Sequence, residues 1–344
     1  MSMMAAALTG EAYAADSCTA LALSGGGSNG SWEAGVFWGF LHYGNKDDFA
    51  YDVMTGVSAG SINAAALAGW AVGKEYEASE WMSDMWNSLT NDDIWTDWPW
   101  GGKAKGLTVE AGVVDNSPLL TFLRKTLSDN FTDWGRRVTY GTANVNDGSY
   151  TTFSQNNISF LESADAAFAS ASIPFIFPNY NWEGKGVFMD GGTVYNINLD
   201  SAIEQCMEIV DDESKITIDI LICGSNADPE IWDKAGNSWS NYFRARDLHK
   251  FYNGCDDISH TMQGHPKINY RYTLVQEESL SGFDELSFGS EKTWPMQELG
   301  RQQAQDALNS SNVNELFHAY HQDEALQATY PKVGDFIDTM LRLK

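Results

Sequence analysis

Two short glycine-rich segments hold residue types that together can perform acyl transfer. Gly56–Gly60 reads G-V-S-A-G, and Gly25–Gly30 reads G-G-G-S-N-G. Glycines two positions before and after a serine fit a sharp strand-to-helix turn that exposes the hydroxyl, so Ser58 is the predicted nucleophile. Consecutive glycines at a helix start, and the first amide after the serine, can donate backbone N–H groups to an oxyanion. The predicted oxyanion and substrate-binding residues are Gly25, Gly26, Gly27 and Ala59.

A serine hydroxyl needs a base, and Asp190 is the predicted one. It stands at the end of a predicted strand, and Gly191-Gly192 follows, where the chain can turn and expose the carboxylate. An ordinary aspartate has a pKa near 3.9, so this role requires a dry site that makes the carboxylate more basic. The alternative is a triad of serine, histidine and aspartate with His249 or His318 as the base.

The glycine-rich segment also satisfies G-x-G-x-x-G, the pattern of a dinucleotide-binding loop. That interpretation expects an acidic residue at the end of the next strand, to hold a ribose hydroxyl. Here the next predicted strand runs into the serine turn instead. The pairing of the two segments therefore favours acyl transfer over dinucleotide binding.

The elements around these residues predict an α/β protein. Apolar strands at 19–24 and 51–57 alternate with helical patterns at 28–43 and 59–72, which implies parallel strands with right-handed crossovers. Asp147-Gly148 and the Gly184–Gly186 segment indicate two hairpins, the second of which leads to Asp190. Further helices are expected at 75–89, from 116 and at 160–172, and further strands at 215–223 and 269–275.

In the order in which these motifs occur, the chain resembles the patatin-like phospholipases. The family's hallmarks are a G-G-G-x-[RK]-G loop, a G-x-S-x-G turn and a later D-G-[GA], which match Gly25–Gly30, Gly56–Gly60 and Asp190–Gly192. Ala169–Pro174 is similar to a segment that precedes the family's catalytic aspartate. The similarity covers about residues 18–208.

The resemblance implies a three-layer α/β/α patatin-like fold, with a mostly parallel central sheet and helices on both faces. It also implies a dyad of Ser58 and Asp190 without histidine, a lipid substrate such as a phospholipid or another acyl ester, and no metal or other cofactor. Asn29 departs from the pattern, because the family usually has Arg or Lys there, and so does Asn198, where many members have Pro. A catalytically silent storage or binding protein of the same fold remains a rival.

The charge composition bears on which partners the protein can bind. With 21 basic and 47 acidic residues the net charge is −26, which gives no electrostatic reason to bind nucleic acid or anionic lipid surfaces.

Residues 1–17 are interpreted as a leader or the remnant of a signal segment, and 18–344 as one domain with a motif-bearing core at 18–208 and a mainly helical extension at 225–344. Secretion or an endolysosomal location is favoured over the cytoplasm. The four cysteines fit two disulfides or buried thiols equally well: Cys18, Cys206, Cys223 and Cys255.

Two further segments bear on membranes. The uncharged run 53–73 is long enough to span a bilayer, but its glycines and polar residues favour a strand, a turn and a buried helix. Trp95, Trp98 and Trp100 lie in a loop between helices. Clustered tryptophans suit transient contact with a membrane or micelle surface, or a loop packed on the core.

Overall fold

The computed structural model describes residues 15–223, 236–280 and 282–309. The predicted leader up to residue 14 and the chain after 309, with His318, lie outside the described residues.

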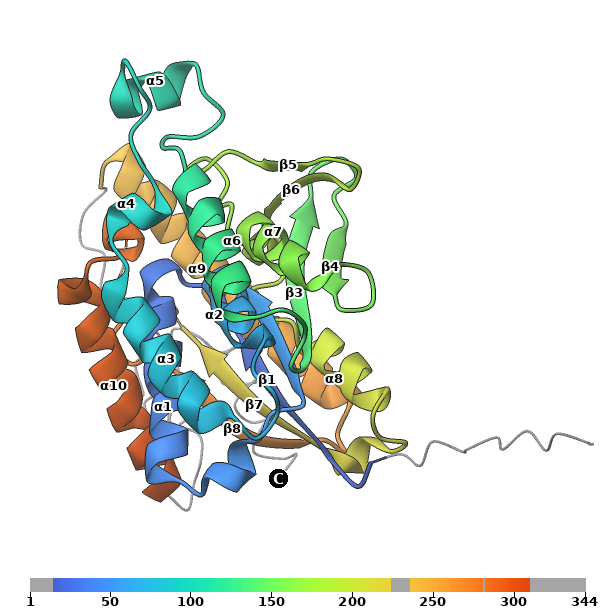
Figure 1. Cartoon of the computed structure of the whole chain (residues 1–344). Coiled ribbons are helices and arrows are strands. Elements are labelled where there is room, and N and C mark those ends of the chain that lie inside the picture. Colours follow the sequence, from blue (N-terminus) through green and yellow to red (C-terminus); the bar gives the residue numbers. More distant parts are fainter. Residues whose placement is uncertain (1–14, 224–235, 281, 310–344) are drawn as a thin grey trace, which may run out of the picture.

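A single mixed sheet forms the middle layer (Figure 1). Its order is β5-β6-β3-β2-β1-β7-β8, with β4 paired to β3 off this path. Strands β3, β2, β1, β7 and β8 run parallel to one another, whereas β4, β5 and β6 add antiparallel pairs. The strands are β1 (Cys18–Leu23), β2 (Val53–Val57), β3 (Arg137–Asn144), β4 (Tyr150–Ser154), β5 (Tyr180–Trp182), β6 (Gly186–Asp190), β7 (Ile216–Ile222) and β8 (Asn269–Val275).

Helices cover both faces of the sheet, so the predicted three-layer α/β/α architecture is confirmed (Figure 1). The α-helices are α1 (Gly30–Tyr43), α2 (Ala59–Ala68), α3 (Glu75–Ser88), α4 (Asn91–Ile94), α5 (Gly102–Thr108), α6 (Ser117–Asn130), α7 (Ser163–Ser170), α8 (Leu199–Met207), α9 (Ser238–Gly264) and α10 (Ser290–Asn309). Short 3₁₀ turns include η1 (Gly27–Asn29), η2 (Lys46–Phe49), η3 (Phe160–Glu162), η4 (Gly191–Thr193), η5 (Glu213–Lys215) and η6 (Gly282–Leu286).

Strand β1 shows how side-chain alternation builds two cores. Leu21 and Leu23 belong to the larger core on the side of α1, α2 and α3. Ala20 and Ala22 point to the opposite face, where α8 and α9 supply apolar side chains such as Ile258. Because successive side chains of a strand point to opposite faces, a strand that is apolar throughout has to lie between two helical layers.

Helix α10 lies far from the motifs in sequence but packs directly on α1. A Cβ atom added to Gly35 would lie 2.1 Å from the carbonyl oxygen of Gln297, and one added to Gly39 would lie 2.6 Å from the Cβ of Ala304. The two helices therefore need glycine to approach this closely. Thus β8 and α10, both beyond residue 208, complete the sheet and cover the helix that follows the glycine-rich segment.

The predicted hairpins are present, and the uncharged run 53–73 divides as expected into β2, a turn at Ser58 and α2. Helix α2 ends at Ala68, earlier than predicted, because Gly69 follows and packs against Phe131. Within the described residues, no helix is both long enough and apolar enough to cross a bilayer. Of the cysteines whose side chains are described, Cys18 and Cys206 form a disulfide and Cys223 is a buried thiol.

Candidate active site

The serine turn has the strained geometry expected of a nucleophile elbow. Strand β2 ends at Val57, and Ser58 adopts φ 52° and ψ −119° before α2 begins at Ala59. A Cβ atom on Gly56 would lie 2.2 Å from the carbonyl oxygen of Gly60, so glycine is required there. A left-handed conformation of a residue other than glycine costs about 1–3 kcal/mol and persists only where surrounding contacts hold it.

Ser170, at the end of α7, supplies such a contact. Its hydroxyl accepts a hydrogen bond from the backbone N–H of Ser58 at 2.8 Å and donates to the carbonyl of Gly141 on β3 at 2.6 Å. This hydroxyl therefore joins the elbow to the neighbouring strand. Ser170 lies within Ala169–Pro174, the segment that resembles the family, so its sequence context was a signal although its role was not predicted.

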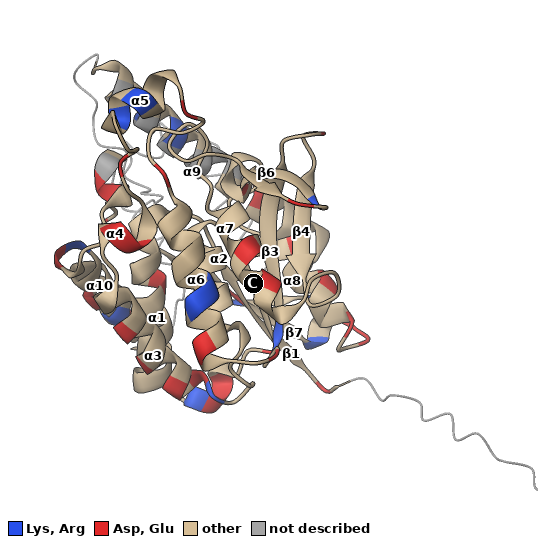
Figure 2. Ribbon diagram, turned by 45° about the horizontal axis from the view of Figure 1, so that its top comes forward, with Lys and Arg blue, Asp and Glu red and all other residues tan. Residues whose placement is uncertain are grey.

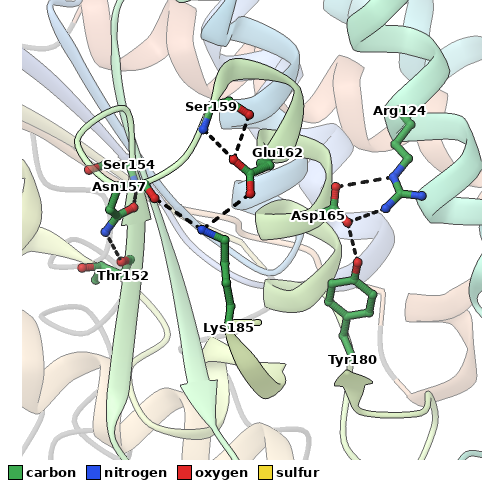
Figure 3. Close-up of polar contacts among 9 residues, drawn as sticks. All are labelled: Arg124, Thr152, Ser154, Asn157, Ser159, Glu162, Asp165, Tyr180 and Lys185. Atoms are coloured by element: carbon green, nitrogen blue, oxygen red, sulfur yellow. Dashed lines mark hydrogen bonds and ion pairs between the residues drawn. The ribbon is translucent and has the colours of Figure 1, made fainter. Parts of the chain in front are cut away.

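Helix α7 is itself anchored at both sides by polar contacts (Figure 3). Asp165 forms an ion pair with Arg124 of α6 at 2.6 Å and accepts a hydrogen bond from the hydroxyl of Tyr180 on β5. In the preceding turn, Glu162 accepts hydrogen bonds from the backbone and hydroxyl of Ser159, and lies 3.5 Å from Lys185 of the β5–β6 hairpin. These contacts fix the helix that holds the elbow.

The glycine-rich segment lies against the elbow. A Cβ atom on Gly25 would lie 2.9 Å from the Cβ of Ser58, so only glycine allows this approach. The N–H of Gly25 donates to the carbonyl of Asn196 at 3.1 Å, and the side-chain amide of Asn196 donates to the carbonyl of Gly25 at 3.1 Å. Gly27 has φ 60°, and a Cβ there would lie 2.4 Å from the carbonyl oxygen of Glu285.

Asp190 ends β6 opposite Thr142 of β3. Its Oδ1 accepts a hydrogen bond from the N–H of Gly192 at 2.8 Å, and its own N–H donates to the carbonyl of Ser172 at 2.9 Å. A Cβ on Gly191 would lie 2.3 Å from the carbonyl oxygen of Gly141, so the tight turn depends on glycine. Asp190 is only 7% exposed.

One cavity of about 280 Å³ brings these elements together. Ser58, Asp190 and Gly27 line it, although they come from three distant parts of the chain. The other lining residues are Ile173, Pro174, Gly192, Thr193, Asn196, Tyr242, Arg246 and His249. His249, which the triad alternative names, thus reaches the same cavity.

Asn196 and Arg246 were not singled out from the sequence. Asn196 bonds to Gly25, and Arg246 forms an ion pair with the buried Glu285. Neither stands in a local pattern that would reveal its role, because each reaches the site through contacts between segments far apart in the chain. Within the described residues, no cluster of His, Cys, Asp and Glu has an arrangement that could hold a metal ion.

Comparison with known protein families identifies the family of this chain. The family model described as patatin-like phospholipase matches residues 21–203, more than half of the chain. The chain belongs to the patatin-like phospholipase family. At the level of the family it is a lipid acyl hydrolase. Comparison with curated protein sequences gives no match.

Two solved structures similar to this patatin-like chain come from bacteria. VipD from Legionella pneumophila is 12% identical, with a TM-score of 0.39, and the match covers 95% of this chain and 75% of that one. ExoU, in its complex with SpcU from the type III secretion system of Pseudomonas aeruginosa, is 15% identical, with a TM-score of 0.36. That match covers 96% of this chain and 60% of the other.

The two departures from the patatin-like pattern have structural roles. Asn29 is fully buried, and its amide donates to the carbonyls of Gly26 and Leu280, both at 3.0 Å, while its oxygen accepts from the N–H of Leu280 at 2.7 Å. It therefore ties the glycine-rich segment to the chain after β8. Asn198 caps α8 by accepting a hydrogen bond from the N–H of Ser201 at 3.1 Å.

A buried carboxyl group bonds to the residue that precedes the glycine-rich segment. Glu33 of α1 accepts hydrogen bonds at 2.9 Å from the N–H of Ser24, which precedes Gly25, and from the side-chain amide of Asn63 on α2. Burial raises its pKa to about 8, against hydrogen bonds from Asn63, Cys223 and Ser24 that lower it. One side chain thus connects the glycine-rich segment to the helix that follows the nucleophile.

Proposed function

We propose that the protein cleaves fatty acyl esters of lipids with Ser58 as nucleophile and Asp190 as general base. The observation that carries this proposal is the shared cavity, where a serine in a strained elbow and a carboxylate on a separate strand end line the same space. Both residues are nearly buried, at 5% and 7% exposure, so little water competes for the carboxylate. The proposed proton transfer depends on exclusion of water from the site while the ester is bound.

In the proposed reaction the hydroxyl of Ser58 attacks the ester carbonyl and its proton moves to Asp190. The carbonyl oxygen becomes an oxyanion, and collapse of this intermediate transfers the proton to the departing alcohol and leaves an acyl-enzyme. Asp190 then takes a proton from water, which attacks the acyl group. Collapse of this second intermediate releases the fatty acid and returns the proton from Asp190 to the oxygen of Ser58. The net change is hydrolysis of one ester, and no other reactant is consumed.

Backbone N–H groups of the glycine-rich segment and the start of α2 would hold the oxyanion. Because the N–H of Gly25 already donates to Asn196, we assign donation to Gly26, Gly27 and Ala59. Gly25 is then the residue whose missing side chain lets the segment approach Ser58.

Separate Ser58→Ala and Asp190→Asn variants test the dyad. Each is expected to lose at least about a thousandfold in kcat for ester hydrolysis, because removing one member of such a unit disables the whole. Ser128→Ala and Asp129→Asn, exposed on α6, are matched controls that should keep full activity. Near-normal hydrolysis by either site variant refutes the dyad.

One observation favours a second mechanism, since His249 lines the same cavity. In a triad its imidazole would take the proton from Ser58, and an aspartate would orient the imidazole and stabilise its protonated form. His249→Ala separates the two mechanisms: activity close to that of the parent supports the dyad, whereas a loss as large as that of Ser58→Ala supports the triad. A fluorophosphonate probe that labels the parent but not Ser58→Ala identifies the nucleophile in both cases.

A further inference from the structure

The segment at 98–109, here called the tip, projects from the body of the molecule with α5 at its end (Figure 1). Trp100 is 100% exposed and Val109 is 75% exposed. These are the two largest exposures of any large apolar side chain in the described part of the chain. Leu107, at 48%, belongs to the same segment. Exposed apolar side chains gathered in one place mark a binding surface rather than ordinary surface scatter.

The other two tryptophans of this region do not share that exposure. The indole N–H of Trp95 donates to the carbonyl of Leu286, and that of Trp98 donates to the carbonyl of Gly112, both at 2.9 Å. They hold the base of the tip against the body. The sequence allows either an interfacial cluster or a packed loop. In the structure Trp95 packs against the core, Trp98 is half-buried, and Trp100 lies in solvent.

The tip also differs from the rest of the molecule in charge. In a chain of net charge −26, residues 98–109 contain Lys103 and Lys105 and no acidic residue. The lysines of α5 are coloured blue in Figure 2. Lys103 lies 5.3 Å from the ring of Trp95, and Lys105 lies 2.5 Å from Glu110 just outside the tip. The arrangement is apolar side chains with lysines beside them, as in segments that enter a phospholipid headgroup layer.

Backbone contacts connect the tip to the cavity of the candidate active site. The N–H groups of Val113 and Val114 donate to the carbonyls of Phe175 and Ile176, both at 3.1 Å. Phe175 is 47% exposed, and the two residues before it, Ile173 and Pro174, line the cavity. The segment that follows the tip therefore forms part of the wall beside the cavity that holds Ser58.

We infer that the tip is an interfacial anchor: Trp100, Leu107 and Val109 enter the surface of a phospholipid bilayer, and Lys103 meets its phosphate groups. The anchor holds the cavity next to the layer from which an acyl chain would come. This inference rests on the proposed lipid hydrolysis for its purpose, but binding to a bilayer can be measured without any hydrolysis.

Binding is tested by co-sedimentation of the full chain with phosphatidylcholine vesicles, in a Ser58→Ala background so that the vesicles stay intact. Adding Trp100→Ala should weaken partition at least about tenfold, because a large side chain no longer leaves water. Adding Lys103→Gln should weaken it about fivefold on vesicles that also contain phosphatidylglycerol. Trp294→Ala is the matched control, since Trp294 is 42% exposed on α10, outside the tip.

A second measurement uses Trp100→Ala with Ser58 intact. Hydrolysis of a short soluble ester should equal that of the parent, while hydrolysis of vesicle lipid should fall together with binding. Vesicle binding that Trp100→Ala does not change overturns the inference, and so does an equal loss on the soluble ester. A parent dimer that Trp100→Ala dissociates also overturns it, since the tip would then be a contact between two copies. If instead the parent hydrolyses no ester but its binding needs Trp100, the proposed function fails and the anchor stands.

Discussion

Replacing Glu33 by glutamine is expected to remove a pH-dependent loss of stability that the parent protein shows around neutrality. The Glu33 side chain is fully buried, and burial raises its pKa from 4.5 to about 8. In the unfolded chain the carboxyl group ionises near its ordinary pKa. Between these two values the folded state holds a proton that the unfolded state has released.

The difference between the two pKa values of Glu33 sets the sign and size of the pH effect on stability. Stability from the protonated group is fully present below pH 4.5, and it is lost as the pH rises through about 8. With 1.36 kcal/mol for each unit of pKa, the total loss is about 5 kcal/mol, of which about 4 kcal/mol falls between pH 5 and pH 9. The glutamine amide does not ionise, so Glu33→Gln lacks this loss.

Glutamine has its own cost, because its NH₂ group would meet one of two donors, the N–H of Ser24 or the amide of Asn63. A donor left without an acceptor in a buried site costs about 1–3 kcal/mol at every pH. We therefore expect Glu33→Gln to be less stable than the parent at pH 5 and equal or more stable at pH 9.

The assay is urea unfolding of the parent and Glu33→Gln at pH 5, 7 and 9, with the difference in free energy of unfolding compared across pH. Other titrating groups are common to both proteins and cancel in this difference. Glu183→Gln, an exposed substitution in the β5–β6 hairpin, serves as the control and should give a difference independent of pH. If the free energies of unfolding of the parent and Glu33→Gln changed with pH in parallel, burial would not raise the pKa of this carboxyl group, and the prediction would be wrong.

Two further predictions concern the support of the elbow and the disulfide. Ser170→Ala removes the partner of the Ser58 N–H and of the Gly141 carbonyl, so it should lower the free energy of unfolding by about 1–3 kcal/mol and reduce kcat for ester hydrolysis; unchanged kcat would mean that the elbow holds its conformation without this hydroxyl. The Cys18–Cys206 disulfide closes a loop with a sequence separation of 188, so its reduction, or replacement of both cysteines by serine, should cost about 5 kcal/mol and lower Tm in thermal unfolding. Equal Tm values with and without reductant would contradict that figure.

Local patterns in the sequence were sufficient for the elements and motifs of the candidate site. Gly56–Gly60 predicted a strand, a turn and a helix, and the structure has β2, Ser58 with positive φ, and α2 at that place. Asp147-Gly148 predicted the hairpin between β3 and β4, where Gly148 has φ 76°. These features depend on steric preferences of a few neighbouring residues, so a short segment contains the information that specifies them.

Local patterns in the amino-acid sequence were therefore enough to predict the α/β class, the family motifs and the candidate pair Ser58 and Asp190. Four features became known only from the folded chain: the pairing of Cys18 with Cys206, the presence of His249 at the cavity, the burial of Glu33 and the exposure of Trp100. Each of these depends on packing between segments far apart in the chain. Burial, pKa and exposure are properties of the surroundings that folding creates, and no short stretch of sequence contains them.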